Sequence, residues 1–337
     1  MMPELLRIGT RNSELARWQA MQVQELLARQ GLKSVLVPVE SLGDRDQHTP
    51  LYAMGVQGVF TRHLDQALLA RDVDLAVHSL KDVPVQPANG ICLAAVLPRG
   101  PVNDVLICRE TAWLEDARAQ ATIATGSIRR RAAWLHRYPH HRVMDLRGNI
   151  PTRLRKFRES SWQGALFAQA ALERLAISLQ PDEKMISLPW IIPAPGQGAI
   201  AVAVREEDAE LREFCAARLN DPHTALCVNM ERAFLQAMEG GCSTPICAYA
   251  RIEAALPAWE STEETFSVIF TAQVLSPDGS RKLDIELKKN LQSREIVSRA
   301  DGLIEEIARE AAENLLSRGA KNLLRSSHHP SNPNPNL

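Results

Sequence analysis

The chain has 337 residues, 45% hydrophobic and 23% charged, which is typical of a folded protein with room for two or three domains. It contains no run of about 18 apolar residues and no signal-peptide core, so we expect a cytoplasmic protein without a membrane span. The six cysteines include no Cys-x-x-Cys pair, which argues against a zinc site or a disulfide framework.

Strand and helix patterns alternate over the first part of the chain. The expected elements are a strand at 5–9, a helix at 14–30 capped by Ser13, a strand at 34–39, a helix at 60–69 and a strand at 75–77. Such alternation predicts an α/β domain with a mostly parallel sheet. The last strand leads into Lys81-Asp82-Val83-Pro84, which taken alone is more typical of a solvated turn than of a catalytic site.

Positive charge is concentrated in the middle of the chain. Residues 129–158 hold nine arginines and Lys156 against one acid, Asp145, although the whole chain has a net charge of −1. The arginine clusters follow strands expected at 122–125 and 142–146, and a third strand is expected at 165–168. Ligands of open α/β sheets bind at the carboxyl ends of strands, where helix N-termini add N–H donors. We therefore expect an anion-binding site at this edge.

Three interpretations of this arginine block remain open from the residues alone. A nucleic-acid surface is one, but aromatic residues for stacking are scarce and the arginines do not form one helix stripe. A small polyanion suits arginine's bidentate contacts with carboxylate or phosphate at least as well. A solvated helix face without any ligand is the third.

Two proline-rich passages, 98–101 and 189–195, flank the arginine block. We interpret them as hinge strands, which predicts a discontinuous first lobe at 1–98 and 196–217 and a second lobe at 102–192. Residues 220–325 predict a small α+β domain. Its expected elements are a helix that starts at Pro222 after the cap Asp221, strands at 266–275 and 283–287, and a helix at about 294–316. The tail, 326–337, has the composition of a disordered segment.

The helix after Asp221 ends at Gly240-Gly241 and is followed at once by Cys242. A thiol on a glycine loop is accessible, which suits a reactive or cofactor-carrying cysteine. By contrast, Cys92, Cys108 and Cys227 lie in apolar runs and are expected in the core.

Taken together, these residues resemble the hydroxymethylbilane synthase family, whose members are also called porphobilinogen deaminases. The resemblance covers about residues 5–320 in order and at matching spacing, through Thr10-Arg11-Asn12-Ser13, Ala76 to Pro84, Gly126-Ser127-Ile128-Arg129-Arg130, Leu146-Arg147-Gly148-Asn149, Thr152-Arg153-Leu154, Pro195-Gly196-Gln197-Gly198-Ala199 and Glu239-Gly240-Gly241-Cys242. It implies two α/β lobes like those of periplasmic binding proteins, joined by two hinge strands, and a small C-terminal α+β domain. It also implies a transferase of tetrapyrrole and heme biosynthesis. Such an enzyme adds four porphobilinogen molecules, with loss of ammonia, to a dipyrromethane primer and releases hydroxymethylbilane by hydrolysis.

The resemblance assigns roles to single residues. Cys242 would carry the dipyrromethane through a thioether, and Asp82 would be the catalytic aspartate that stabilises positive charge on a pyrrole ring. The cofactor would be bound by Lys81, Asp82, Thr125, Ser127, Arg129, Arg130 and Arg153. The incoming substrate or growing chain would be bound by Arg11, Ser13, Gln19, Arg147 and Arg153. The carboxylates of the pyrrole units would be the ligands of the arginines, and no metal is expected.

Some positions depart from the family pattern, namely Leu42, Ala53, Gln57, Gly126, Pro151 and Ala203. Ala53 and Gln57 bring no positive charge to their loop, which puts substrate affinity and chain release in question. Asp82, the arginine pairs and Cys242 are all present. The resemblance further implies a monomer with porphobilinogen as its small-molecule partner, no nucleic acid or membrane, and a hand-over of product to uroporphyrinogen-III synthase. The alternative is a non-catalytic small-polyanion-binding protein of the same lobed fold.

Overall fold

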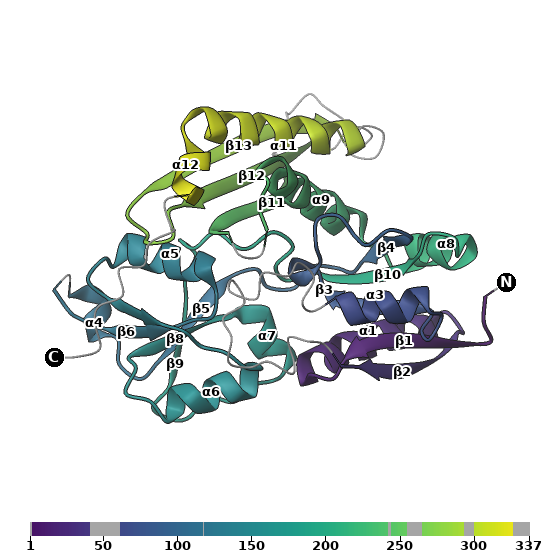
Figure 1. Cartoon of the computed structure of the whole chain (residues 1–337), viewed down its shortest axis with the longest axis horizontal. Coiled ribbons are helices and arrows are strands. Elements are labelled where there is room, and N and C mark those ends of the chain that lie inside the picture. The colour runs from purple at the N-terminus through teal and green to yellow at the C-terminus, as the bar shows by residue number, and fades with distance from the viewer. Residues whose placement is uncertain are drawn as a thin grey trace.

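The computed structural model describes residues 2–40, 61–116, 118–241, 244–254, 265–292 and 300–325. Its strands form three sheets, two of five strands and one of three (Figure 1). Several positions singled out from the sequence lie outside the described residues: Leu42, Ala53, Gln57, Cys242 and the tail 326–337.

The first sheet combines the N-terminal part of the chain with one strand from beyond residue 199. Its order is β2-β1-β3-β10-β4. The bounds are β1 Leu5–Arg11, β2 Lys33–Val39, β3 Leu75–Ser79, β4 Ile91–Val96 and β10 Ile200–Arg205, with helices α1 Glu14–Arg29, α3 Arg62–Leu69 and α8 Ala209–Arg218. Apolar side chains of α1 and α8 pack with those of the sheet around Leu6, Val77 and Val202.

The second sheet has the order β7-β6-β8-β5-β9. Its elements are β5 Asp104–Cys108, β6 Thr122–Ala124, β7 Arg142–Met144, β8 Gly164–Ala168 and β9 Lys184–Ser187, with helices α4 Ala112–Glu115, α5 Ile128–Arg137, α6 Ile150–Arg158 and α7 Gln169–Arg174. Two connections link the lobes. They lie side by side, because the amide of Gly100 donates to the carbonyl of Gly198 over 3.1 Å.

Both lobe sheets are mostly parallel, as the sequence predicts, and each contains one strand that runs the other way. In the first sheet β10 runs antiparallel to β3 and β4, and in the second β5 runs antiparallel to β8 and β9. Both exceptional strands directly follow a connection between the lobes. Such a strand enters its sheet from the hinge side, so it runs opposite to strands that are reached through a helix within the lobe.

The third sheet, β11-β12-β13, is antiparallel throughout, and helices α9 and α11 pack on it. The bounds are α9 Pro222–Ala237, β11 Ile246–Ala254, β12 Thr265–Leu275, β13 Lys282–Gln292, α11 Ala300–Ser317 and α12 Ala320–Arg325. Figure 1 shows this domain above both lobes, with α9 beside β4 and β10. Asp221 caps α9 and Pro222 opens it, as the sequence predicts.

Candidate functional site

The N-terminus of α5 is fixed by two small polar residues, Thr125 and Ser127. Ser127 is the N-cap, and its hydroxyl accepts from the amide of Arg130 over 3.4 Å. The hydroxyl of Thr125, at the end of β6, accepts from the amide of Ser127 over 3.2 Å. Thr125 and Ser127 therefore fix the start of the helix that carries Arg129 and Arg130.

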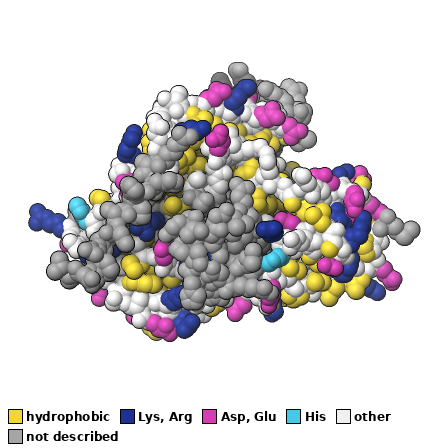
Figure 2. Space-filling model, in the orientation of Figure 1, with side chains coloured by type: hydrophobic (Ala, Val, Ile, Leu, Met, Phe, Trp, Pro, Cys, Tyr) yellow, Lys and Arg dark blue, Asp and Glu magenta, His cyan; other side chains and the backbone are white. Residues whose placement is uncertain are grey.

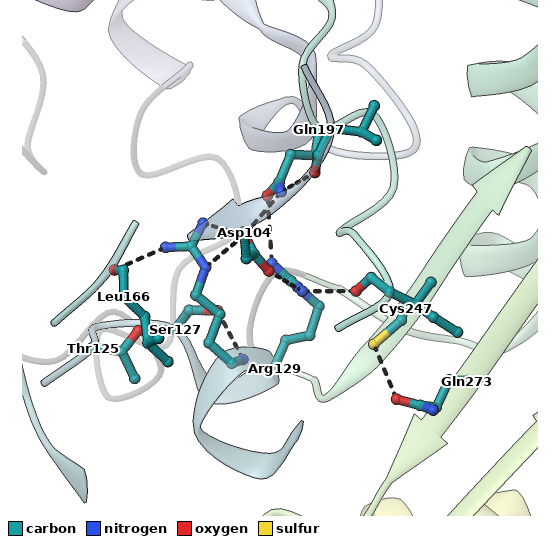
Figure 3. Close-up of polar contacts among 11 residues, drawn as sticks. Asp104, Thr125, Ser127, Arg129, Leu166, Gln197, Cys247 and Gln273 are labelled. Carbon is teal, nitrogen blue, oxygen red and sulfur yellow. Dashed lines mark hydrogen bonds and ion pairs between the residues drawn. The ribbon is translucent and has the colours of Figure 1, made fainter. Parts of the chain in front are cut away.

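Arg129 and Arg130 share one buried carboxylate, that of Asp104 (Figure 3). Nη1 of Arg129 lies 2.7 Å from Oδ2, and Nη2 of Arg130 lies 2.8 Å from Oδ1. The amide of Gln197 also donates to Oδ1 over 2.9 Å. Asp104 is fully buried, and the two guanidinium groups hold its pKa well below the usual range despite the opposing effect of burial. Sequence reasoning assigned Asp104 no role.

Lys81 and Asp82 lie on a short 3₁₀ turn, Leu80–Asp82, at the end of β3. The hinge packs closely on this turn: a Cβ on Gly196, whose φ is +72°, would lie 2.9 Å from Cγ of Leu80 and 3.2 Å from the amide nitrogen of Lys81. Burial and, to a smaller extent, the positive charge of Arg130 lower the pKa of Lys81 to about 8. The turn that starts from lobe 1 is thus in electrostatic contact with the arginines of lobe 2.

A pocket on the lobe 1 side gathers four of the residues that the sequence predicts for substrate binding and catalysis. It is lined by Arg11, Ser13, Leu15, Ala16, Gln19, Val77, His78, Ser79 and Asp82. The side chain of Gln19 donates to the hydroxyl of Ser79 over 2.8 Å and accepts from it over 3.0 Å. Ser13 caps α1. Burial, with a further effect of Arg11, lowers the pKa of His78 to about 4, so its imidazole is neutral at physiological pH.

Arg153 on α6 belongs to the same charged region. Its Nε donates to the carbonyl of Gly148 over 2.7 Å. Burial and the charges of Arg130 and Arg147 together lower its pKa to about 10, although Asp82 acts in the opposite direction. Arg153 is therefore in electrostatic contact with the arginines of its own lobe and with the carboxylate of the opposite lobe. Arg147 itself is buried.

The described part of the site holds more positive than negative charge. The cations are Lys81, Arg11, Arg129, Arg130, Arg147 and Arg153, and the acids among the site residues just described are Asp82 and Asp104. Like charges in a desolvated region repel, so this arrangement favours binding of a ligand with several carboxylates. Within the described ranges no group of three His, Cys, Asp or Glu side chains could hold a metal ion.

The arginines of the middle block differ in exposure: Arg137, Arg142 and Arg155 are exposed, and Arg131, Arg153 and Arg158 are partly buried. Arg129, Arg130 and Arg147 are buried, and on the face seen in Figure 2 blue side chains are interspersed with magenta ones. The three buried arginines are not open to a long nucleic acid, whose binding requires a basic stripe exposed to the solvent. No helix in the described segments is both long and apolar enough to span a bilayer.

The cysteine positions fall into two groups. Cys108 and Cys227 are buried and Cys92 is partly buried, which agrees with their expected place in the core. Cys242 lies outside the described residues, but the described chain reaches Gly241 directly after α9. The hydroxyl of Thr244 donates to the carbonyl of Gly241 over 2.7 Å, so the two described ends beside Cys242 lie close together.

Comparison with known proteins identifies two family models in the chain. "Porphobilinogen deaminase, dipyromethane cofactor binding domain" matches residues 6–213, and "Porphobilinogen deaminase, C-terminal domain" matches residues 225–315. The chain is 38% identical to porphobilinogen deaminase of Chloroherpeton thalassium over 325 residues, which are 96% of this chain and 98% of that protein. It is 40% identical to the Rubrobacter xylanophilus protein of the same name over 320 residues, 95% of this chain and 96% of the relative.

Solved structures with a similar fold include a periplasmic domain, VFT2, of BvgS from Bordetella pertussis, with a TM-score of 0.39 and 13% identity over 63% of this chain and 86% of that one. An ancestral cationic amino acid solute binding protein has a TM-score of 0.41 and 12% identity over 64% of this chain and 87% of the other.

Proposed function

The chain belongs to the porphobilinogen deaminase family, and we propose that it condenses four porphobilinogen molecules on a covalently bound dipyrromethane and releases hydroxymethylbilane. The observation that carries this proposal is the excess of buried cations around Asp82 and Asp104 where the two lobes face each other. Every pyrrole unit of the chain carries carboxylates, so the growing product is a polyanion that these side chains can neutralise.

The residues present fit a dipyrromethane. Burial and neighbouring cations lower the pKa values of Arg153 and Lys81, and a bound carboxylate would relieve the repulsion between the cations. Arg129 and Arg130 are already oriented by Asp104, so a ligand meets fixed guanidinium groups instead of mobile side chains. When bound, the dipyrromethane supplies the nucleophilic pyrrole carbon that starts the chain. We propose Lys81, Asp82, Thr125, Ser127, Arg129, Arg130 and Arg153 as its binding residues and Cys242 as its anchor.

Asp82 is the proposed catalytic residue. Its carboxylate, at the end of the turn Leu80–Asp82, lines the pocket together with Arg11 and Gln19. There it can accept a hydrogen bond from a pyrrole N–H and stabilise the positive charge that develops on the ring as ammonia leaves. Arg11, Ser13, Gln19, Arg147 and Arg153 are proposed to hold the carboxylates of the incoming unit and of the growing chain.

The remaining proposals rest on the resemblance described above. We propose a cytoplasmic monomer that takes porphobilinogen from solution and hands its product to uroporphyrinogen-III synthase. The proposed domain limits are 1–98 with 196–217, 102–192, and 220–325.

The test is the intact mass of the purified protein beside that of Cys242→Ser. We expect the wild type to exceed its sequence mass by two linked pyrrole units and the variant to lack this excess. Asp82→Ala should retain the adduct and lose turnover, because it removes the carboxylate and leaves the cations in place. A bare mass in the wild type that persists after incubation with porphobilinogen would favour the non-catalytic polyanion binder.

A further inference from the structure

The helix α9, which precedes Cys242 in the chain, also forms hydrogen bonds with the segment directly after Asp82. Arg232 on α9 donates from Nη1 to the carbonyl of Val83 over 3.0 Å, and from Nη2 to the carbonyls of Pro84 and Val85 over 2.8 and 2.9 Å. The residue is 8% exposed. One guanidinium of the C-terminal domain thus contacts three consecutive carbonyls of lobe 1.

The segment after Asp82 is partly fixed by Val83, whose amide donates to the carbonyl of Leu80 over 3.0 Å and whose side chain packs in an apolar cluster with Val96 and Val228. It belongs to no strand, and Pro84 has no backbone N–H to donate. Hydrogen bonds from a charged donor are stronger than neutral ones, so Arg232 is well suited to fix this stretch. On the other side of Asp82, the amide of Leu80 donates to the carbonyl of Ala199 over 3.0 Å. The turn with the carboxylate is therefore held at both ends, upstream by the hinge and downstream by α9.

The helix itself is fixed at the neighbouring residue. The carboxylate of Glu231 is fully buried and forms a bidentate pair with Arg99 at 2.6 and 3.0 Å. It also accepts from the amides of Gly196 over 2.7 Å and Ala250 over 2.9 Å. Arg232 therefore projects from a part of α9 that is anchored to both connections between the lobes.

We infer that Arg232 is a positioning residue for Asp82: by holding the carbonyls of Val83, Pro84 and Val85, it sets the place of the catalytic carboxylate relative to the pocket. The inference rests on the proposed function. If Arg232 has this role, the C-terminal domain both carries Cys242 and fixes the position of the Asp82 carboxylate, next to which the cofactor is proposed to bind.

The test compares Arg232→Met, which keeps a long side chain but loses all donors, with Arg232→Lys, which keeps one charged donor group. For Arg232→Met we expect kcat to fall about tenfold with KM changed less than threefold, because the carboxylate is displaced while the substrate-binding arginines remain. Arg232→Lys should recover part of kcat. The matched control is Arg318→Met, which removes an arginine of the same domain that donates to the carbonyl of Asp284 and lies on the surface.

A double-mutant cycle separates positioning from a general loss of structure. If Arg232 acts through Asp82, Arg232→Met should lower kcat less than twofold further in an Asp82→Glu background, whose carboxylate is already displaced. The inference would be overturned if the effects of Arg232→Met and Asp82→Glu on kcat were fully additive in free energy. It would also be overturned if kcat of Arg232→Met lay within twofold of the wild-type value. If Arg232→Met does not fold, Arg232→Lys in both backgrounds decides by the same criteria. Failure of the proposed function is distinguishable, since the wild type would then show no turnover.

Discussion

His78 links the site to the pH dependence of stability. Its pKa is about 4 in the folded protein, against 6.5 for an unperturbed histidine. The unfolded chain therefore binds the proton more readily between these values, and the free energy of unfolding falls as the pH is lowered from 6.5 to 4. The full effect of this one group is about 3 kcal/mol.

We expect His78→Gln, which cannot be protonated, to show a flatter dependence of stability on pH in this window, as measured by urea unfolding at several pH values. His223→Gln, at an exposed position of α9, is the control and should keep the wild-type slope. His141, whose pKa is also lowered, remains in both variants, so the difference between them isolates His78. Equal slopes in the two variants would show that His78 is not held neutral by burial.

At the scale of single residues, the sequence predicted members of the site but not their partners. The arginine block and the resemblance identified Arg129 and Arg130, whereas Asp104 was missed. The available signal was the position of Asp104 directly before the apolar run Val105-Leu106-Ile107, which predicts a buried strand. A carboxylate in such a place is rarely buried without a positively charged partner. The partner could not be deduced, because β5 and α5 are separated in the chain and meet only after folding.

At the scale of elements, Gly126 shows how one departure from the family pattern depends on local packing. A Cβ at this position would lie 2.6 Å from the carbonyl oxygen of Leu146, which belongs to the backbone and cannot turn aside. A side chain here would push apart the start of α5 and the segment that carries Arg147. We expect Gly126→Ser to lower the free energy of unfolding by about 1–3 kcal/mol and to raise KM, because the arginines at both places would move.

Gly302→Ser is the matched control for this prediction. Gly302 lies on the exposed side of α11, a Cβ there would meet nothing within 4 Å, and serine favours a helix more than glycine does. Chemical denaturation and steady-state kinetics on both variants provide the measurement. Unchanged stability of Gly126→Ser would mean that the two segments can separate at little cost.

Elements were predictable where the signal was local. The predicted caps Ser13 and Asp221 match because each depends on a side chain and the amides of the next turn. Strand direction was not predictable in the same way. The antiparallel courses of β5 and β10 follow from the two connections between the lobes, and no local pattern in those strands records how the chain returns.

At the scale of the whole molecule, Glu231 joins three parts of the chain that are far apart in sequence. Its carboxylate binds Arg99 on the first connection between the lobes, the amide of Gly196 on the second, and the amide of Ala250 on β11. Both charges of the pair are largely removed from solvent, with side-chain exposures of 11% for Arg99 and 0% for Glu231. Removal of one partner from such a buried pair typically destabilises a protein by about 3–5 kcal/mol, because the other charge stays desolvated.

We therefore expect Glu231→Gln to weaken the attachment of the C-terminal domain more than it weakens any single sheet. Differential scanning calorimetry should show one cooperative transition in the wild type and, in the variant, an earlier separate transition of one part of the molecule. Glu310→Gln removes an exposed pair with Lys289 on the same domain and should leave the wild-type profile, since such surface pairs contribute at most about 1 kcal/mol. A single transition in Glu231→Gln, shifted as a whole, would instead mean that apolar packing between the domains is sufficient to keep them one folding unit. In that case the carboxylate would stabilise the hinge without coupling the domain that carries Cys242 to the lobes.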